Sequence, residues 1–244
     1  MAEGRRDPPE TAIAVHLSVI IPARNEAATL ARVVERVIAT GLAGEVIVVD
    51  DGSDDDTEVV LRAISEAHPA SIRILRHATP RGKGAATRTG LAACRGDIIL
   101  VQDADLEYDP AEYPALLAPF ADARVDAVYG SRNLRANPRS SFAYYWGGRG
   151  LSRAVNLLYG AALTDESTGF KLVRAPVMRS LGLRCDGFAF CAELTSHLLR
   201  RGCVIREVPI SYRPRTHAEG KKIRWRDGII AIAVMLRLRF ARVR

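Results

Sequence analysis

Residues 97–107 join a short apolar run directly to a cluster of carboxylates. The apolar run, residues 98–101, contains β-branched residues and is long enough for one strand that is buried on both faces of a parallel sheet. Asp103, Asp105 and Glu107 follow it at once. In open α/β sheets, ligands bind beyond the carboxyl ends of the strands. Hard oxygen ligands gathered there favour Mg²⁺ or Mn²⁺, which commonly bind phosphate groups.

The same pattern recurs along the chain, because other apolar runs also end in polar residues. Residues 17–21 precede Arg24 and Glu26, residues 45–49 precede Asp51, and residues 127–129 precede Arg132. Between these runs, apolar residues recur at helical spacing. The alternation predicts a doubly wound, mostly parallel α/β sheet. The expected strands cover residues 17–21, 45–49, 72–75, 98–101, 127–129, 170–173 and 204–210, and the expected helices include 27–40, 84–94 and 143–159.

Charge narrows the class of partner. The chain of 244 residues has a net charge of +7, and twelve of its 35 Lys and Arg residues lie in residues 201–244. Such basicity fits nucleic acid, an anionic membrane surface or phosphorylated substrates. Nucleic-acid binding is the non-enzyme alternative. It is disfavoured because no RRM, KH or helix-turn-helix signature is present, and because the predicted sheet edge is strongly acidic.

The N-terminal residues and the cysteines exclude several other classes. We expect residues 1–14 to form a disordered arm, since they are polar and have no apolar signal-peptide core. The four cysteines have no CxxC spacing, which disfavours zinc and favours free thiols in a reducing compartment. No run approaches the roughly 18 apolar residues of a membrane span. These features predict a cytoplasmic protein that is soluble or peripheral to the membrane, of unspecified oligomeric state.

The last segment is predicted to be a basic amphipathic helix. We place it at residues 223–244, after a main domain at residues 15–222. Residues 229–236 are apolar, and Arg237, Arg239, Arg242 and Arg244 follow. One interpretation is a terminal helix with a solvated basic face. The other is a helix that lies on an anionic bilayer at the cytoplasmic face of the membrane.

Several motifs together resemble a known family. Residues 18–26, 48–53 and 102–107 are similar to those of family 2 glycosyltransferases of GT-A fold. Residues 82–84, 130–132, 165–171 and 207–212 narrow the resemblance to the dolichol-phosphate mannosyltransferase and polyprenyl-phosphate glycosyltransferase group. The resemblance extends over about residues 17–228. It implies an inverting enzyme that moves a sugar from GDP-mannose or a UDP-hexose to a polyprenyl phosphate, with Mg²⁺ or Mn²⁺ as cofactor.

The same resemblance implies roles for individual residues. Asp103, Asp105 and Glu107 would hold the metal, although Glu107 stands where many relatives carry Gln. Arg132 would bind the acceptor phosphate. Asp105, Asp165 and Glu193 are the candidate catalytic residues. The candidate donor-binding residues are Pro22, Arg24, Glu26, Asp51, Lys83, Gln102, Asp103, Arg213, Arg215 and Lys221.

The acceptor decides whether a general base is needed. A phosphate oxygen is already anionic and requires positioning, whereas a hydroxyl acceptor requires deprotonation. The resemblance places Glu193 where hydroxyl-using relatives carry a base, but Glu193 also fits a simple helix-start carboxylate. Asp165 fits either a substrate-orienting residue or a cap. The alternative function is therefore a soluble family 2 enzyme that glycosylates a hydroxyl of a small molecule or polysaccharide.

Overall fold

The protein is described by a computed structural model over residues 16–138, 142–215 and 225–241. Several predictions lie outside these residues. They are the arm at 1–14, the domain boundary between 222 and 223, and the side chains of Lys221, Arg242 and Arg244.

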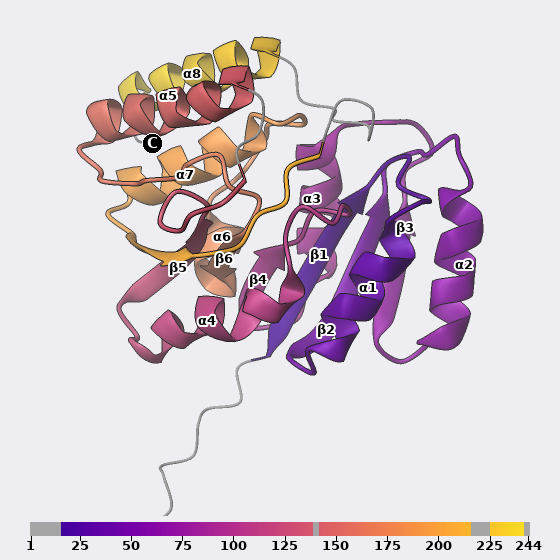
Figure 1. Ribbon diagram of the computed structural model, residues 1–244. Coiled ribbons are helices and arrows are strands. Elements are labelled where there is room, and N and C mark those ends of the chain that lie inside the picture. The colour runs from indigo at the N-terminus through magenta and orange to yellow at the C-terminus, as the bar shows by residue number, and fades with distance from the viewer. Residues whose placement is uncertain (1–15, 139–141, 216–224, 242–244) are drawn as a thin grey trace, which may run out of the picture.

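A seven-stranded sheet forms the centre of the described molecule (Figure 1). The strand order is β3-β2-β1-β4-β6-β5-β7, and β6 alone runs antiparallel to its two neighbours. The mostly parallel, doubly wound sheet predicted from the sequence is therefore confirmed. The strands are β1 (Leu17–Ala23), β2 (Ala43–Asp50), β3 (Ile72–Arg76), β4 (Ile98–Val101), β5 (Val125–Ser131), β6 (Lys171–Arg174) and β7 (Val204–Pro209).

Helices cover both faces of the sheet. On one face, α1, α2 and α4 pack against residues such as Val19, Val48 and Leu100. On the other face, α3, α6 and α7 pack against residues such as Ile20 and Ile99. Alternate residues of each strand therefore point into the hydrophobic cores on opposite faces of the sheet. The helices are α1 (Leu30–Ala39), α2 (Thr57–Ala67), α3 (Lys83–Ala93), α4 (Tyr113–Leu117), α5 (Phe142–Tyr159), α6 (Ala175–Ser180), α7 (Phe190–Arg200) and α8 (Trp225–Phe240), with 3₁₀ turns at Pro110–Glu112 and Ala118–Ala121.

Strand direction places the polar segments at one edge of the sheet. Because β1, β2 and β4 are parallel, the segments that follow Ala23, Asp50 and Val101 begin at the same edge. β5 runs the same way, so Arg132 starts from this edge as well. The antiparallel β6 begins here, which adds the preceding segment, residues 165–170.

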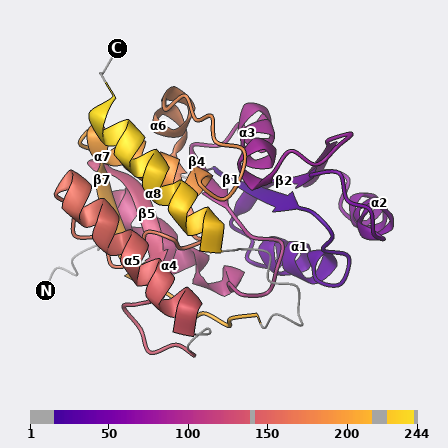
Figure 2. The same ribbon diagram turned by 90° about the horizontal axis from the view of Figure 1, so that it is seen from above.

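The outermost layer consists of α5 and α8, which lie side by side over α7 (Figures 1 and 2). α8 buries Ala231, Val234 and Met235, and the Tyr159 hydroxyl donates to the Met235 carbonyl at 2.7 Å. The predicted C-terminal helix is thus present and packs on the main body. Within the described part of the chain, no helix combines the length and apolar character that crossing a membrane requires.

Candidate active site at the carboxyl edge of the sheet

Asp103 lies at the centre of this edge, directly after β4. Lys83, the first residue of α3, donates a hydrogen bond from its ammonium to Asp103 Oδ1. Burial, the largest single influence, would lower the Lys83 pKa, but the charge and hydrogen bond of Asp103, together with Cys191 and Glu107, raise it. A Cβ atom at Gly169 would lie 2.6 Å from Asp103 Oδ2, so glycine is required there to leave room for the carboxylate.

Arg215 brings the segment after β7 back across the same edge. Its Nη2 lies 2.8 Å from Glu26 Oε2 and 3.5 Å from Asp105 Oδ2. The Arg215 backbone N–H donates to Glu107 Oε1 at 2.6 Å, and the Arg213 N–H donates to the Glu107 carbonyl at 3.0 Å. Glu107 therefore anchors the basic segment.

The predicted metal site of Asp103, Asp105 and Glu107 stays a prediction. Among the described residues, no group of three or more His, Cys, Asp or Glu side chains is arranged to hold a metal ion. Asp103 and Asp105 still fit the cation, because Mg²⁺ is commonly bound by one or two carboxylates together with substrate phosphates and water. In the structure, Lys83 contacts Asp103 and Arg215 contacts Asp105.

Asp51 organises the turn that leads into α3. Its carboxylate accepts the backbone N–H groups of Arg81 and Gly82 at 2.8 and 2.7 Å, and it lies 2.7 Å from Nδ1 of His77. Gly82 has φ +102°, a conformation that L side chains rarely adopt. Asp51 thus holds the backbone that positions Lys83, and its predicted contact with the base or ribose stays a prediction.

Other predicted donor residues differ in their access to the edge. Pro22 is half-buried within the last residues of β1, and Arg24, which directly follows β1, is exposed. Gln102 is fully buried. Its side-chain oxygen accepts the Tyr113 hydroxyl at 2.8 Å, and its Nε2 donates to the Asp103 carbonyl at 3.0 Å. The geometry therefore favours a supporting role for Gln102 behind Asp103.

Arg132 and Asp165 form a bidentate ion pair. Arg132 Nε and Nη2 lie 2.7 Å from the two carboxylate oxygens of Asp165, which is 1% exposed. The guanidinium also stacks 5.0 Å from the Tyr212 ring centre. Glu207 accepts the backbone N–H groups of Thr164 and Asp165 at 2.7 and 2.9 Å. The predicted acceptor-phosphate residue is thus held by a predicted catalytic residue.

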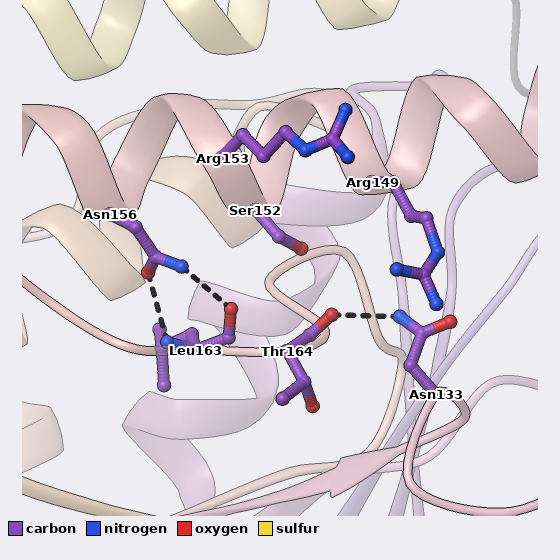
Figure 3. A pocket seen from close by; sticks show the side chains of 7 residues that line it. All are labelled: Asn133, Arg149, Ser152, Arg153, Asn156, Leu163 and Thr164. Carbon is purple, nitrogen blue, oxygen red and sulfur yellow. Dashed lines mark hydrogen bonds between the residues drawn. The ribbon is translucent and has the colours of Figure 1, made fainter.

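A cationic pocket lies under α5 (Figure 3), and its lining residues Asn133 and Thr164 are next in sequence to Arg132 and Asp165. Its volume is about 300 Å³, and none of the described residues that line it is acidic. Arg149 and Arg153 extend from α5, while an Asn133 side-chain N–H donates to the Thr164 carbonyl at 2.7 Å. The lining residues are Asn133, Arg149, Ser152, Arg153, Asn156, Leu163 and Thr164.

The sequence interpretation missed this pocket, although a signal was present. Arg149 and Arg153 are four residues apart in a segment that was predicted to be helical, and such residues share one face of a helix. What the sequence could not reveal was that Asn133, which follows β5, would lie opposite that face.

Glu193 occupies a different environment from that of an exposed base. It is 2% exposed, and both of its carboxylate oxygens lie 3.0 Å from the Arg184 backbone N–H. The Cys185 N–H donates to Oε2 at 2.8 Å. The carboxylate therefore fixes the backbone of residues 184–185, which favours a positioning role. Its role as general base stays a prediction.

Comparison with known proteins identifies the family of this chain. The family model described as glycosyl transferase family 2 matches residues 18–182. The chain belongs to this family. The resemblance to family 2 glycosyltransferases noted from the motifs is thus confirmed.

Curated relatives of this family 2 chain include two bacterial enzymes named undecaprenyl-phosphate 4-deoxy-4-formamido-L-arabinose transferase. The enzyme of Pseudomonas paraeruginosa is 30% identical over 209 residues, which is 84% of this chain and 60% of the relative. That of Salmonella paratyphi A is 30% identical over 214 residues, 84% of this chain and 62% of the relative. The chain therefore spans about three fifths of the length of these relatives.

Solved structures similar to this family 2 chain include glucosyl-3-phosphoglycerate synthase from Mycobacterium tuberculosis, and the GT-A fold is confirmed. Its complex with Mn²⁺, UDP-glucose and phosphoglyceric acid has a TM-score of 0.71 at 25% identity, covering 96% of this chain and 85% of that one. Its complex with Mg²⁺ and UDP has a TM-score of 0.69 at 25% identity, covering 92% and 79%.

Proposed function

We propose that this glycosyltransferase moves a sugar from a nucleoside diphosphate sugar to a polyprenyl phosphate, with Mg²⁺ or Mn²⁺ and with inversion. One observation carries the proposal. The carboxyl edge of the sheet holds two carboxylate–cation pairs, Asp103 with Lys83 and Asp105 with Arg215. The cationic pocket under α5 lies at the same end of the sheet. The first arrangement suits a metal-bound diphosphate and the second suits a phosphate without a metal.

The donor half would be built on Asp103 and Asp105. A divalent cation held there would neutralise the diphosphate and stabilise it as a leaving group. Lys83 and Arg215 would then turn from these carboxylates to the diphosphate oxygens, where charge develops as the nucleoside diphosphate leaves. The complexes of the mycobacterial synthase with Mn²⁺ or Mg²⁺ and UDP support a metal and favour a uridine donor.

The acceptor half would be the α5 pocket. Arg149 and Arg153 would bind the phosphate, with Arg132 at its rim held by Asp165. A phosphate oxygen would form the bond to the sugar C1, and the bond from C1 to the donor diphosphate would break, with its electrons leaving on the diphosphate. No proton moves, so no base is required. The names of the curated relatives, which include undecaprenyl phosphate, support this acceptor.

A small phosphorylated acceptor is the second candidate. The solved neighbour was crystallised with phosphoglyceric acid, and the phosphate of such an acceptor would suit the same pocket. Its hydroxyl would need a base, however. Glu193, the candidate for that task, is buried and accepts two backbone N–H groups. This observation favours the lipid phosphate.

The outer surface of α8 supports contact with a membrane. Trp225 and Phe240 are 72% and 76% exposed, and Ile229 and Ile230 are more than half exposed. Leu157 on the neighbouring α5 is 87% exposed. Together with the arginines of α8, these side chains form an apolar surface with a basic rim. We propose that this surface lies on anionic lipid, with α8 in the interface rather than across it.

A substrate screen tests the proposed function. Purified protein with Mn²⁺ or Mg²⁺ would be given UDP-glucose, other UDP-sugars or GDP-mannose, each with a short polyprenyl phosphate or with phosphoglycerate. Transfer to the lipid phosphate is expected, and the anomeric configuration of the product would be determined by NMR. Turnover with phosphoglycerate and with no lipid phosphate would establish the second candidate instead.

A further inference from the structure

The buried Glu193 carboxylate is connected to the donor side of the site through a loop. Glu193 lies in the first turn of α7, and its carboxylate accepts the backbone N–H groups of Arg184 and Cys185 at 2.8–3.0 Å. Two backbone hydrogen bonds to one buried carboxylate hold that segment firmly, because hydrogen bonds to ionised groups are strong. Residues 184–187 are hereafter called the 184–187 loop.

The 184–187 loop in turn packs on the N-terminal end of α3. The Ala85 N–H donates to the Asp186 carbonyl at 3.1 Å. Arg88 donates to the Cys185 carbonyl at 2.6 Å and pairs with the Asp186 carboxylate. A Cβ atom at Gly84 would overlap the Cys185 carbonyl, so the two backbones are in direct contact.

Lys83 is the residue that this packing positions. It lies between Gly82 and Gly84, both of which approach the 184–187 loop closely, and its ammonium contacts Asp103. From this chain of contacts we infer that Glu193 is a positioning residue, which seats Lys83 for the donor diphosphate through the 184–187 loop. The inference rests on the proposed function, because it assigns the diphosphate as the ligand of Lys83.

This role separates Glu193 from a general base in a measurable way. A base acts on the acceptor, so its loss lowers kcat by about 10²- to 10⁴-fold with donor binding intact. A positioning residue on the donor side instead weakens binding of the nucleoside diphosphate itself. It leaves the KM for the acceptor unchanged.

The experiment measures the Kd of the released nucleoside diphosphate, UDP or GDP, with Mn²⁺ by calorimetry, without acceptor. Glu193→Gln is expected to raise this Kd about tenfold. Arg88 is half-buried and contacts the outer side of the 184–187 loop, so Arg88→Gln should loosen the loop while the protein remains folded. This variant is also expected to raise the Kd. Glu45→Gln is the matched control: Glu45 also accepts a backbone N–H, from Arg95, but at the opposite edge of the sheet.

Steady-state kinetics complete the test. A raised donor KM in both Glu193→Gln and Arg88→Gln, alongside the raised nucleotide Kd, supports the inference; kcat is expected to fall as well, because Lys83 would also stabilise the leaving diphosphate. An unchanged nucleotide Kd in both variants overturns it, as does a loss confined to kcat in Glu193→Gln. If the Kd rises as expected but wild-type protein glycosylates no lipid phosphate, the acceptor assignment fails and the role of Glu193 stands.

Discussion

Asp105 has a guanidinium beside it, with Arg215 Nη2 3.5 Å from its Oδ2. Replacement by Asn keeps the size of the side chain and removes the charge that would bind the cation. We expect kcat to fall by about 100-fold or more, which is typical when one electrostatic contact to a developing charge is lost. We also expect half-maximal activity to require more Mn²⁺. The measurement is initial rate against Mn²⁺ concentration.

Asp97→Asn is the control for this prediction, because Asp97 lies at the opposite end of β4 and accepts the His16 backbone N–H. Full activity of Asp105→Asn at an unchanged Mn²⁺ requirement would contradict the proposed metal contact.

Cys185 provides a pH-dependent report on Glu193. Burial, assisted by the neighbouring Glu193 carboxylate, raises the pKa of the Cys185 thiol to about 11. Alkylation of Cys185 by iodoacetamide should therefore be slow at pH 8 and should accelerate up to about pH 11, because the thiolate is the reactive form. In Glu193→Gln the negative neighbour is absent, so the pKa falls. A fall of about one unit would speed the reaction at pH 8 about tenfold.

Site-resolved mass spectrometry would measure this rate, with Cys94 as the internal control, since burial rather than Glu193 raises its pKa, to about 12. Equal Cys185 rates in wild type and variant would show that the carboxylate does not act on this loop.

At the scale of the element, Arg149 and Arg153 of α5 line the pocket that we propose for the acceptor phosphate. Arg149 and Arg153 each offer a charge-assisted contact worth about 1.5–3 kcal/mol to a phosphate. We expect the Arg149→Ala, Arg153→Ala double variant to raise the KM for polyprenyl phosphate by about 100-fold or more, since 1.4 kcal/mol is a factor of ten. The Kd of the nucleoside diphosphate should be unchanged.

Arg62→Ala on α2 is the control for this helix, because Arg62 is exposed and pairs only weakly, at 3.7 Å from Glu58. A double variant whose donor Kd rises as much as its acceptor KM would place the pocket in the donor half instead.

The strands show how far local pattern predicts an element. Apolar runs located every strand to within about two residues, because a strand buried on both faces needs such a run. The short α6, Ala175–Ser180, was not predicted, since six residues carry too little helical periodicity. The antiparallel direction of β6 was also not predicted, because it depends on the path of the chain through residues 132–170.

At the scale of the whole molecule, α5 and α8 share one outer layer (Figure 2), and both helices carry exposed apolar side chains. We expect the protein to co-sediment with vesicles that contain anionic phosphatidylglycerol and to bind weakly to neutral vesicles. Each basic residue near such a surface adds about 1 kcal/mol. The Ile229→Ser, Ile230→Ser double variant should lose most of this binding, because it removes apolar area that would enter the interface.

Val59→Ser is the matched control, since Val59 is 65% exposed on α2. The rate of sugar transfer to a short, water-soluble acceptor should be the same in wild type, in the Ile229→Ser, Ile230→Ser double variant and in Val59→Ser. Vesicle binding that survives the double variant would exclude this surface of α8 as the contact.

The sequence alone was sufficient for the fold class, the family and the acidic sheet edge. These features follow from local patterns, because strand periodicity and the residues directly after each strand are encoded over a few positions. Local pattern therefore places Asp103, Asp105 and Arg132 at the correct edge of the sheet.

Only the tertiary structure decided which charges meet. The pairing of Arg132 with Asp165, the use of Glu107 and Glu193 to hold backbone, and the pocket of Arg149 opposite Asn133 all join distant segments. Each carboxylate had several cations and N–H groups available to it, and the path of the chain selected among them. For that reason a residue's chemistry could be predicted from the sequence, whereas its partner, and hence its role, could not.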